Sequence, residues 1–110
     1  MSECIYKFEV DYGRHGTLEG TFIATPEDVA FAIGKTVYFE EPWGKHSGAE
    51  CTFEPGHFTV VSADPAEVAT FKRLDLRSGE CPLGLLRDCI LDGRLELKDE
   101  ERAAMPAYYR

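Results

Sequence analysis

The stretch CIYKFEVDYGRHGTLEGTFIA (residues 4–24) has the pattern of two strands joined by a turn, and the rest of the fold can be built around it. Apolar and charged side chains alternate in its first part, where Tyr6 and Phe8 lie on one face. A period of two is typical of a half-buried strand. Two glycines then bracket the polar pair in GRHG, and the alternation resumes at Leu18 and Phe22. The stretch therefore predicts a β-hairpin.

Two further segments carry helix-start signals. In TPEDVAFAIG, Thr25 is a suitable N-cap, Pro26 suits the first helical position, and Gly34 stands where the helix should stop. In SADPAEVATFKRL, Ser62 or Asp64 can serve as the N-cap. Acidic residues near each start favour the positive end of the helix dipole. A short third helix is expected from Pro82.

The segments KTVYFEE, AECTFE and HFTVVS (residues 35–41, 49–54 and 57–62) predict three more strands. The resulting ββαβββα order predicts an α+β fold: an antiparallel sheet of about five strands, with two or three short helices packed on one face. At 110 residues the chain fits a single domain. We expect its core to span about residues 3–91, followed by a C-terminal extension over 92–110.

The charge is unevenly distributed along the chain. The net charge is −8, and residues 1–67 hold twelve Asp and Glu against four Lys and Arg, whereas residues 68–110 hold eight of each. This balance argues against direct binding to nucleic acid, because neutralising phosphates requires clustered cations. A basic protein surface is the more natural partner. Acidity that serves only solubility remains the alternative.

No export signal or membrane-length apolar segment is recognisable in the sequence, which favours a cytoplasmic protein. The four cysteines form no C-x-x-C pair and are expected to be reduced. No zinc-type clustering of Cys and His occurs, and the GKT at residues 34–36 lacks the earlier glycine of a phosphate loop. We therefore predict neither a metal site nor a cofactor.

Strand alternation also predicts an acidic sheet face. One face should meet the helices through these apolar residues: Phe8, Leu18, Phe22, Val37, Phe39, Cys51, Phe53, Phe58 and Val60. The opposite face then collects these carboxylates: Glu9, Asp11, Glu19, Glu40, Glu50 and Glu54. A dense array of carboxylates can imitate a row of phosphates and occupy a nucleic-acid groove on another protein. A merely solvated polar face is the commoner alternative.

The segment EEPWGKHSGAE (residues 40–50) falls in the connection between the third and fourth strands. Its proline and glycines are what a turn requires. Trp43, however, is either an interface anchor or a cover for the edge of the core. Adjacent residues of an extended segment point to opposite sides, so His46 and Ser47 do not form an expected catalytic pair. No catalytic residue is assigned. The candidate partner-binding residues are Glu40, Glu41, Trp43, Lys45, His46, Glu50 and Glu54.

Three segments, GKTVYFEEPWGKHSG (34–48), FTVVSADPAEVATF (58–71) and SGECPLGLLRD (78–88), resemble a group of small, functionally unassigned phage and mobile-element proteins. In that group a G-K-x-V-Y-F run is followed by G-K-H-S. The group often has Gly-Glu after the Phe and Glu after the Ser, whereas this chain has Glu40-Glu41 and Gly48. The resemblance implies a phage or mobile-element context, and hence the host cytoplasm, where small acidic proteins often block defence complexes.

These observations together predict a non-enzymatic binding protein that inhibits a basic, nucleic-acid-handling host complex, such as a CRISPR effector. The alternative is a binder of a small anionic ligand, or a small enzyme, that uses Lys45, His46 and Ser47. An exposed sheet edge would also allow two copies to pair as a homodimer.

Overall fold

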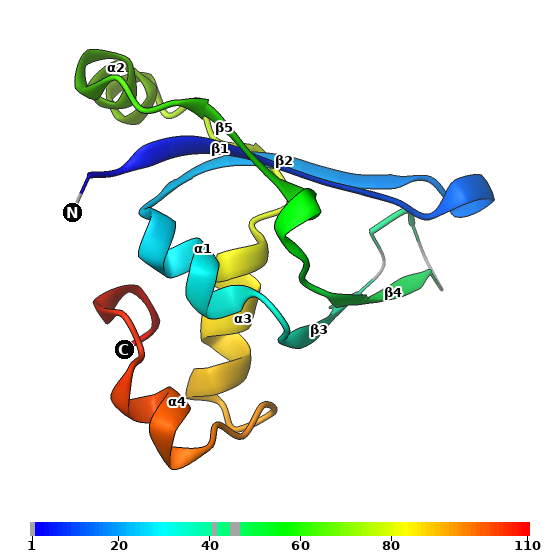
Figure 1. The fold of residues 1–110 in the computed structure, drawn as a ribbon. Helices are drawn as coiled ribbons and strands as arrows, with labels where there is room; N and C mark the ends of the chain where they lie inside the picture. Colours follow the sequence, from blue (N-terminus) through cyan, green and yellow to red (C-terminus); the bar gives the residue numbers. More distant parts are fainter. Residues whose placement is uncertain (1, 41, 45–46) are drawn as a thin grey trace.

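The computed structural model describes residues 2–40, 42–44 and 47–110, and it confirms the α+β class (Figure 1). The larger sheet is antiparallel and has the strand order β5-β1-β2-β6. Its strands are β1 (Cys4–Asp11), β2 (Thr17–Ala24), β5 (Phe58–Ser62) and β6 (Ser78–Gly79). A separate two-stranded sheet consists of β3 (Thr36–Glu40) and β4 (Gly48–Thr52).

Four helices accompany these sheets: α1 (Pro26–Ala32), α2 (Pro65–Leu74), α3 (Pro82–Leu91) and α4 (Asp99–Ala103). Short 3-10 turns occupy Gly13–His15, Pro55–His57 and Ala107–Tyr109. The predicted helix starts are confirmed. Thr25 and Asp28 cap α1 reciprocally, each side chain accepting a hydrogen bond from the other residue's backbone N–H. Asp64 caps α2 by accepting from the N–H of Ala66. None of the helices within the described ranges could span a membrane.

The β1–β2 hairpin forms as predicted, with paired residues running from Cys4↔Ala24 to Asp11↔Thr17. Its inner face carries Tyr6, Phe8, Leu18 and Phe22, all buried in the main core. Phe8 is completely buried and contacts Phe39 and Phe53 of the smaller hairpin segment, with ring centroids 6.0 and 5.9 Å away. The same alternation that predicts the hairpin therefore supplies the centre of the core.

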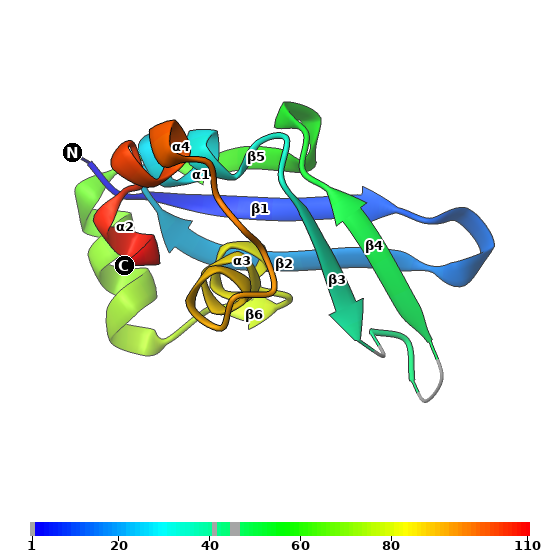
Figure 2. The same ribbon diagram turned by 90° about the horizontal axis from the view of Figure 1, so that it is seen from below.

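The strand arrangement differs from the expected single sheet. Hairpin β3–β4 crosses beneath β1 and β2 instead of extending their sheet (Figure 2). The turn at Pro55–His57 then carries the chain to the far side of β1, where β5 becomes an edge strand. Val60, expected to face the helices, is consequently 50% exposed at that edge. Alternation identifies a strand but does not say which strand it pairs with.

The helices also cover both faces of the larger sheet. Helices α1 and α3 lie below it, while α2 lies above it (Figure 1). Val68 and Phe71 of α2 pack on Ile5 and Ile23, whose side chains point away from the main core. Ile5 interrupts the polar outer face of β1, and its partner Ile23 does the same on β2. These two residues supply the apolar spot on which α2 rests.

The core also continues beyond residue 91, although the sequence pattern predicted that it would end there. Met105 and Tyr109 belong to the buried cluster, and Tyr109 is completely buried. The Tyr109 hydroxyl donates a 2.6 Å hydrogen bond to the backbone carbonyl of Asp28, and its ring lies 4.9 Å from that of Phe31. The expected extension over residues 92–110 is therefore anchored to α1. Sequence reasoning missed this because the apolar residues there are few and follow no regular period.

Candidate functional site

Three carboxylates gather on the outer face of the β1–β2 hairpin. Glu9 and Glu19 stand directly opposite each other across the two strands, and both are exposed. Asp11 follows on β1, opposite Thr17. Lys7 also lies on this face, and its Nζ is 3.9 Å from a carboxylate oxygen of Glu9. Like charges directly opposite in an antiparallel pair are destabilising, so this arrangement works against the stability of the hairpin.

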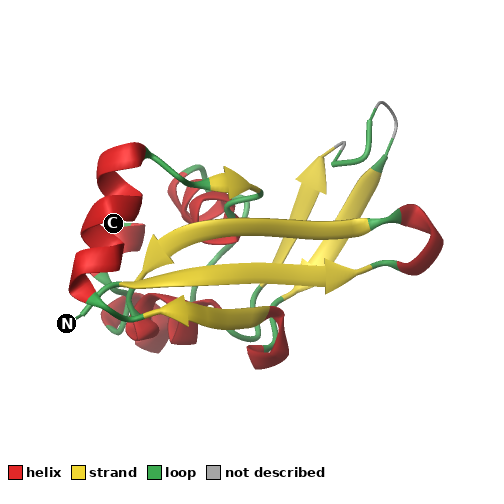
Figure 3. Cartoon of the chain, turned by 90° about the horizontal axis from the view of Figure 1, so that it is seen from above, coloured by secondary structure: helices red, strands yellow, loops and turns green. Residues whose placement is uncertain are grey.

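The outer face of the sheet is divided into two halves. Helix α2 crosses one end of the strands, and the part toward the β1–β2 turn is left uncovered (Figure 3). We call the uncovered part the acidic half; it is made by Lys7, Glu9, Asp11, Thr17, Glu19 and Thr21. The paired strands β1 and β2 hold the carboxylates of this half.

The six carboxylates expected on one face do not lie on one sheet. Glu40 and Glu50 are exposed on the smaller hairpin, opposite Gly48 and Tyr38. Glu54 follows β4, and its carboxylate lies 3.4 Å from the Nε2 atom of His57. The separation of the two sheets therefore divides the predicted acidic face into a β1–β2 group and a β3–β4 group.

Trp43 folds back onto the turn of the β1–β2 hairpin. Its ring packs edge-on against Tyr12, with centroids 5.3 Å apart, and stacks on His15 at 6.3 Å. The indole Nε1 donates to the carbonyl of Thr17 at 3.4 Å. Gly16 has a φ of +121°, and a Cβ placed there would lie 2.7 Å from Nε1. Of the two roles left open for Trp43, the contacts favour covering the edge of the core.

Tyr12 connects the two hairpins. Its hydroxyl donates a 2.8 Å hydrogen bond to the backbone carbonyl of Glu50. Burial, with contributions from Cys51 and Glu50, raises the pKa of Tyr12 to about 12. The sequence did not reveal this cluster of Tyr12, His15 and Trp43, because it depends on how two separate hairpins cross. The glycines on each side of the first turn were its only local signal.

Ser47 is engaged within its own loop. Its hydroxyl donates to the carbonyl of Gly44 at 2.6 Å and accepts from the N–H of Trp43 at 3.1 Å. Both bonds hold the turn in shape, as expected of a structural serine. Glu41, Lys45 and His46, the other predicted site residues of this segment, lie outside the described residues.

Two other features bear on small ligands and metals. Lys35 of the GKT sequence lies 3.3 Å from Glu101 of α4 and donates to the carbonyl of Phe31 at 2.6 Å, so its ammonium group ties α1 to α4. Across residues 2–40, 42–44 and 47–110, no three His, Cys, Asp or Glu side chains are grouped to hold a metal ion. The acidic half carries three carboxylates, from Glu9, Asp11 and Glu19, beside the single ammonium group of Lys7.

Comparisons with protein-family models, with curated proteins and with solved structures gave no significant match.

Proposed function

We propose that this chain is a small acidic, non-enzymatic binding protein that inhibits a basic, nucleic-acid-binding protein complex. The acidic half would occupy the surface on which that complex holds nucleic acid. Given the resemblance of residues 34–88 to phage and mobile-element proteins, the proposed target is a host defence complex such as a CRISPR effector. Trp43, which packs on the hairpin turn and donates to the carbonyl of Thr17, would add a contact at the edge of this surface.

The observation that carries this proposal is the direct pairing of Glu9 with Glu19. Within the isolated protein these two carboxylates repel each other across the hairpin. A Lys or Arg from a partner placed between them would attract both carboxylates and so offset that repulsion. Binding therefore gains electrostatic energy that the folded chain alone does not have.

The overall charge supports the same choice of partner. At a net charge of −8, the protein attracts cationic surfaces and accelerates encounters with them. Direct binding to nucleic acid would be opposed by the same charge. A nucleic-acid-binding protein has a positively charged groove that already accommodates rows of anions. Such a groove is the kind of surface that the acidic half would match.

Affinity capture from a bacterial lysate tests this proposal. The test variant is Glu9→Gln with Glu19→Gln, and the control is Glu96→Gln with Glu100→Gln, which removes the same charge from exposed positions away from the acidic half. We expect the wild type and the control to capture a nucleic-acid-binding complex. The test variant should lose it, and capture should weaken between about 0.05 and 0.5 M salt, because ions screen exposed charges. Equal capture by both double variants would contradict the proposal.

A further inference from the structure

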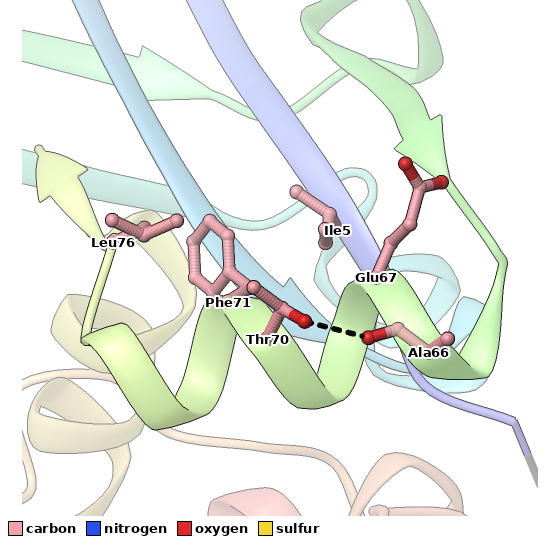
Figure 4. Close-up of a pocket in the computed structure, with 6 residues that line it drawn as sticks. All are labelled: Ile5, Ala66, Glu67, Thr70, Phe71 and Leu76. Atoms are coloured by element: carbon pink, nitrogen blue, oxygen red, sulfur yellow. Dashed lines mark hydrogen bonds between the residues drawn. The ribbon is translucent and has the colours of Figure 1, made fainter.

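A groove lies between α2 and the outer face of the larger sheet (Figure 4). Its volume is about 460 Å³. Ile5 lies on the sheet side of the groove, Phe71 and Ala66 come from α2, and Leu76 follows that helix. Leu76 is 51% exposed, although it is a large apolar residue. The groove therefore offers apolar surface to solvent beside a helix whose buried side chains are those of Val68 and Phe71.

Two polar residues line the groove, and each makes one hydrogen bond within the chain. The hydroxyl of Thr70 donates to the carbonyl of Ala66 at 3.1 Å, as Figure 4 shows. Glu67 accepts a hydrogen bond from the hydroxyl of Ser62. With these groups engaged, the groove suits an apolar side chain better than a polar ligand.

The groove opens toward the acidic half. The depression on the other side of α2 is lined by Ser2 and Glu3, which precede β1, so the groove beside Ile5 faces the rest of that strand. Along the outer face, Lys7 and then Glu9 follow Ile5. Glu9 stands four positions after Ile5, which is about 13 Å along the strand. One bound segment can therefore reach the groove and the Glu9–Glu19 pair at once.

We propose that the groove binds an apolar side chain of the same basic partner, from an extended segment that also places Lys or Arg about four residues away, on Glu9 and Glu19. This inference rests on the proposed function and adds the anchor that the partner needs. Buried apolar anchors surrounded by polar contacts are the usual centres of binding energy in interfaces. A second copy of this chain is a poorer occupant, because it would bring its own excess of acid against the same carboxylates.

A symmetric peptide probe, KSKSTSLSTSKSK, tests this inference because its central leucine has lysines four and six residues away in both directions. We would titrate it into the full chain at low salt and follow the backbone amide signals by NMR. Signals of Ile5, Phe71 and Leu76 should shift together with those of Glu9 and Glu19. A peptide with serine in place of leucine should bind about tenfold more weakly. Lys7→Gln should strengthen binding about twofold by removing the cation between the two subsites.

Matched protein variants test the groove itself. Ala66→Phe fills it, whereas Ala69→Phe makes the same change on the other side of α2. We expect Ala66→Phe to weaken binding about tenfold and Ala69→Phe to change it less than twofold. Leu76→Ser is a second test in case Ala66→Phe disturbs the helix. It removes one wall of the groove and should weaken peptide binding to a similar extent.

The two proposals fail differently in this experiment. If the serine peptide binds as tightly as the leucine peptide, or if filling the groove has no effect, the groove inference is wrong and the proposed function still stands. If a peptide with glutamates in place of the lysines binds equally well, the electrostatic basis of the proposed function is wrong. Dimerisation through the groove, measured by sedimentation and abolished by Ala66→Phe, would overturn the inference in favour of a second copy.

Discussion

Glu9 on β1 and Glu19 on β2 are direct cross-strand partners, so two carboxylates of like charge face each other on an exposed sheet surface. Opposed like charges cost stability, and opposed unlike charges gain about 0.2–1 kcal/mol. The pair therefore lowers the stability of the isolated protein while favouring the binding of a cationic partner.

Glu19→Lys should stabilise the isolated protein and weaken partner binding. We expect an increase of about 0.5 kcal/mol in the free energy of unfolding, because the new ammonium group faces Glu9 across the hairpin. Urea denaturation measures this as a higher midpoint at an unchanged slope. Glu96→Lys makes the same charge change elsewhere, and it should neither stabilise the protein nor weaken partner binding. A destabilised Glu19→Lys variant would show that the pair is not under repulsion.

Gly16→Ala should displace Trp43. The backbone at Gly16 has φ +121° and ψ −168°, a conformation that side chains disfavour by about 1–3 kcal/mol, and the added Cβ would also collide with the indole. We expect lower stability together with a red shift in fluorescence from the single tryptophan. Gly13→Ala is the control, because a Cβ there meets nothing within 4 Å, although φ is +66°. An unshifted spectrum in Gly16→Ala would contradict the packing described.

Stability should fall at alkaline pH, partly through Tyr12. Its pKa is raised from 10.0 to about 12 in the folded protein, so the folded state holds this proton more tightly than the unfolded state does. The associated stability is complete below pH 10 and is lost as the pH rises toward about 12. Burial also raises the pKa of Tyr108 and Tyr109, which adds to the effect. Denaturation at several pH values should show a shallower decline in Tyr12→Phe; an unchanged slope would exclude this contribution.

Tyr109→Phe should destabilise the protein by about 1–2 kcal/mol, because the buried carbonyl of Asp28 loses its hydrogen bond while the ring contact with Phe31 remains. Thermal or urea unfolding measures the loss. Tyr38→Phe is the control, since Tyr38 is 54% exposed and should tolerate the change. If both variants unfold alike, residues 105–110 do not anchor α1 as described.

The elements of the fold were largely predictable, whereas their arrangement was not. Thr25-Pro26 and Asp64-Pro65 marked helix starts because caps are local interactions. Alternation around Phe8 and Leu18 identified the hairpin for the same reason. The pairing of β5 with β1 joins residues 50 to 57 positions apart in the sequence, which no local pattern records.

The candidate site was predictable only in part. Glu9, Asp11 and Glu19 were correctly expected to share an exposed face, because alternation and a short turn fix which side chains lie together. Glu40 and Glu50 were assigned to that face as well, but they lie on the separate smaller sheet. The groove beside α2 was missed because it arises where one helix crosses a sheet, and Ile5 alone gave no sign of it.

A competition measurement on the captured complex tests whether the acidic half occupies the surface that holds nucleic acid. Labelled nucleic acid would be bound to that complex and the wild-type protein added at increasing concentration, with the Glu9→Gln and Glu19→Gln double variant run in parallel. We expect the wild type to release the nucleic acid and the double variant to release little of it. A ternary complex that retains the nucleic acid, or equal release by the two proteins, would contradict the claim that the acidic half occupies the nucleic-acid-binding surface.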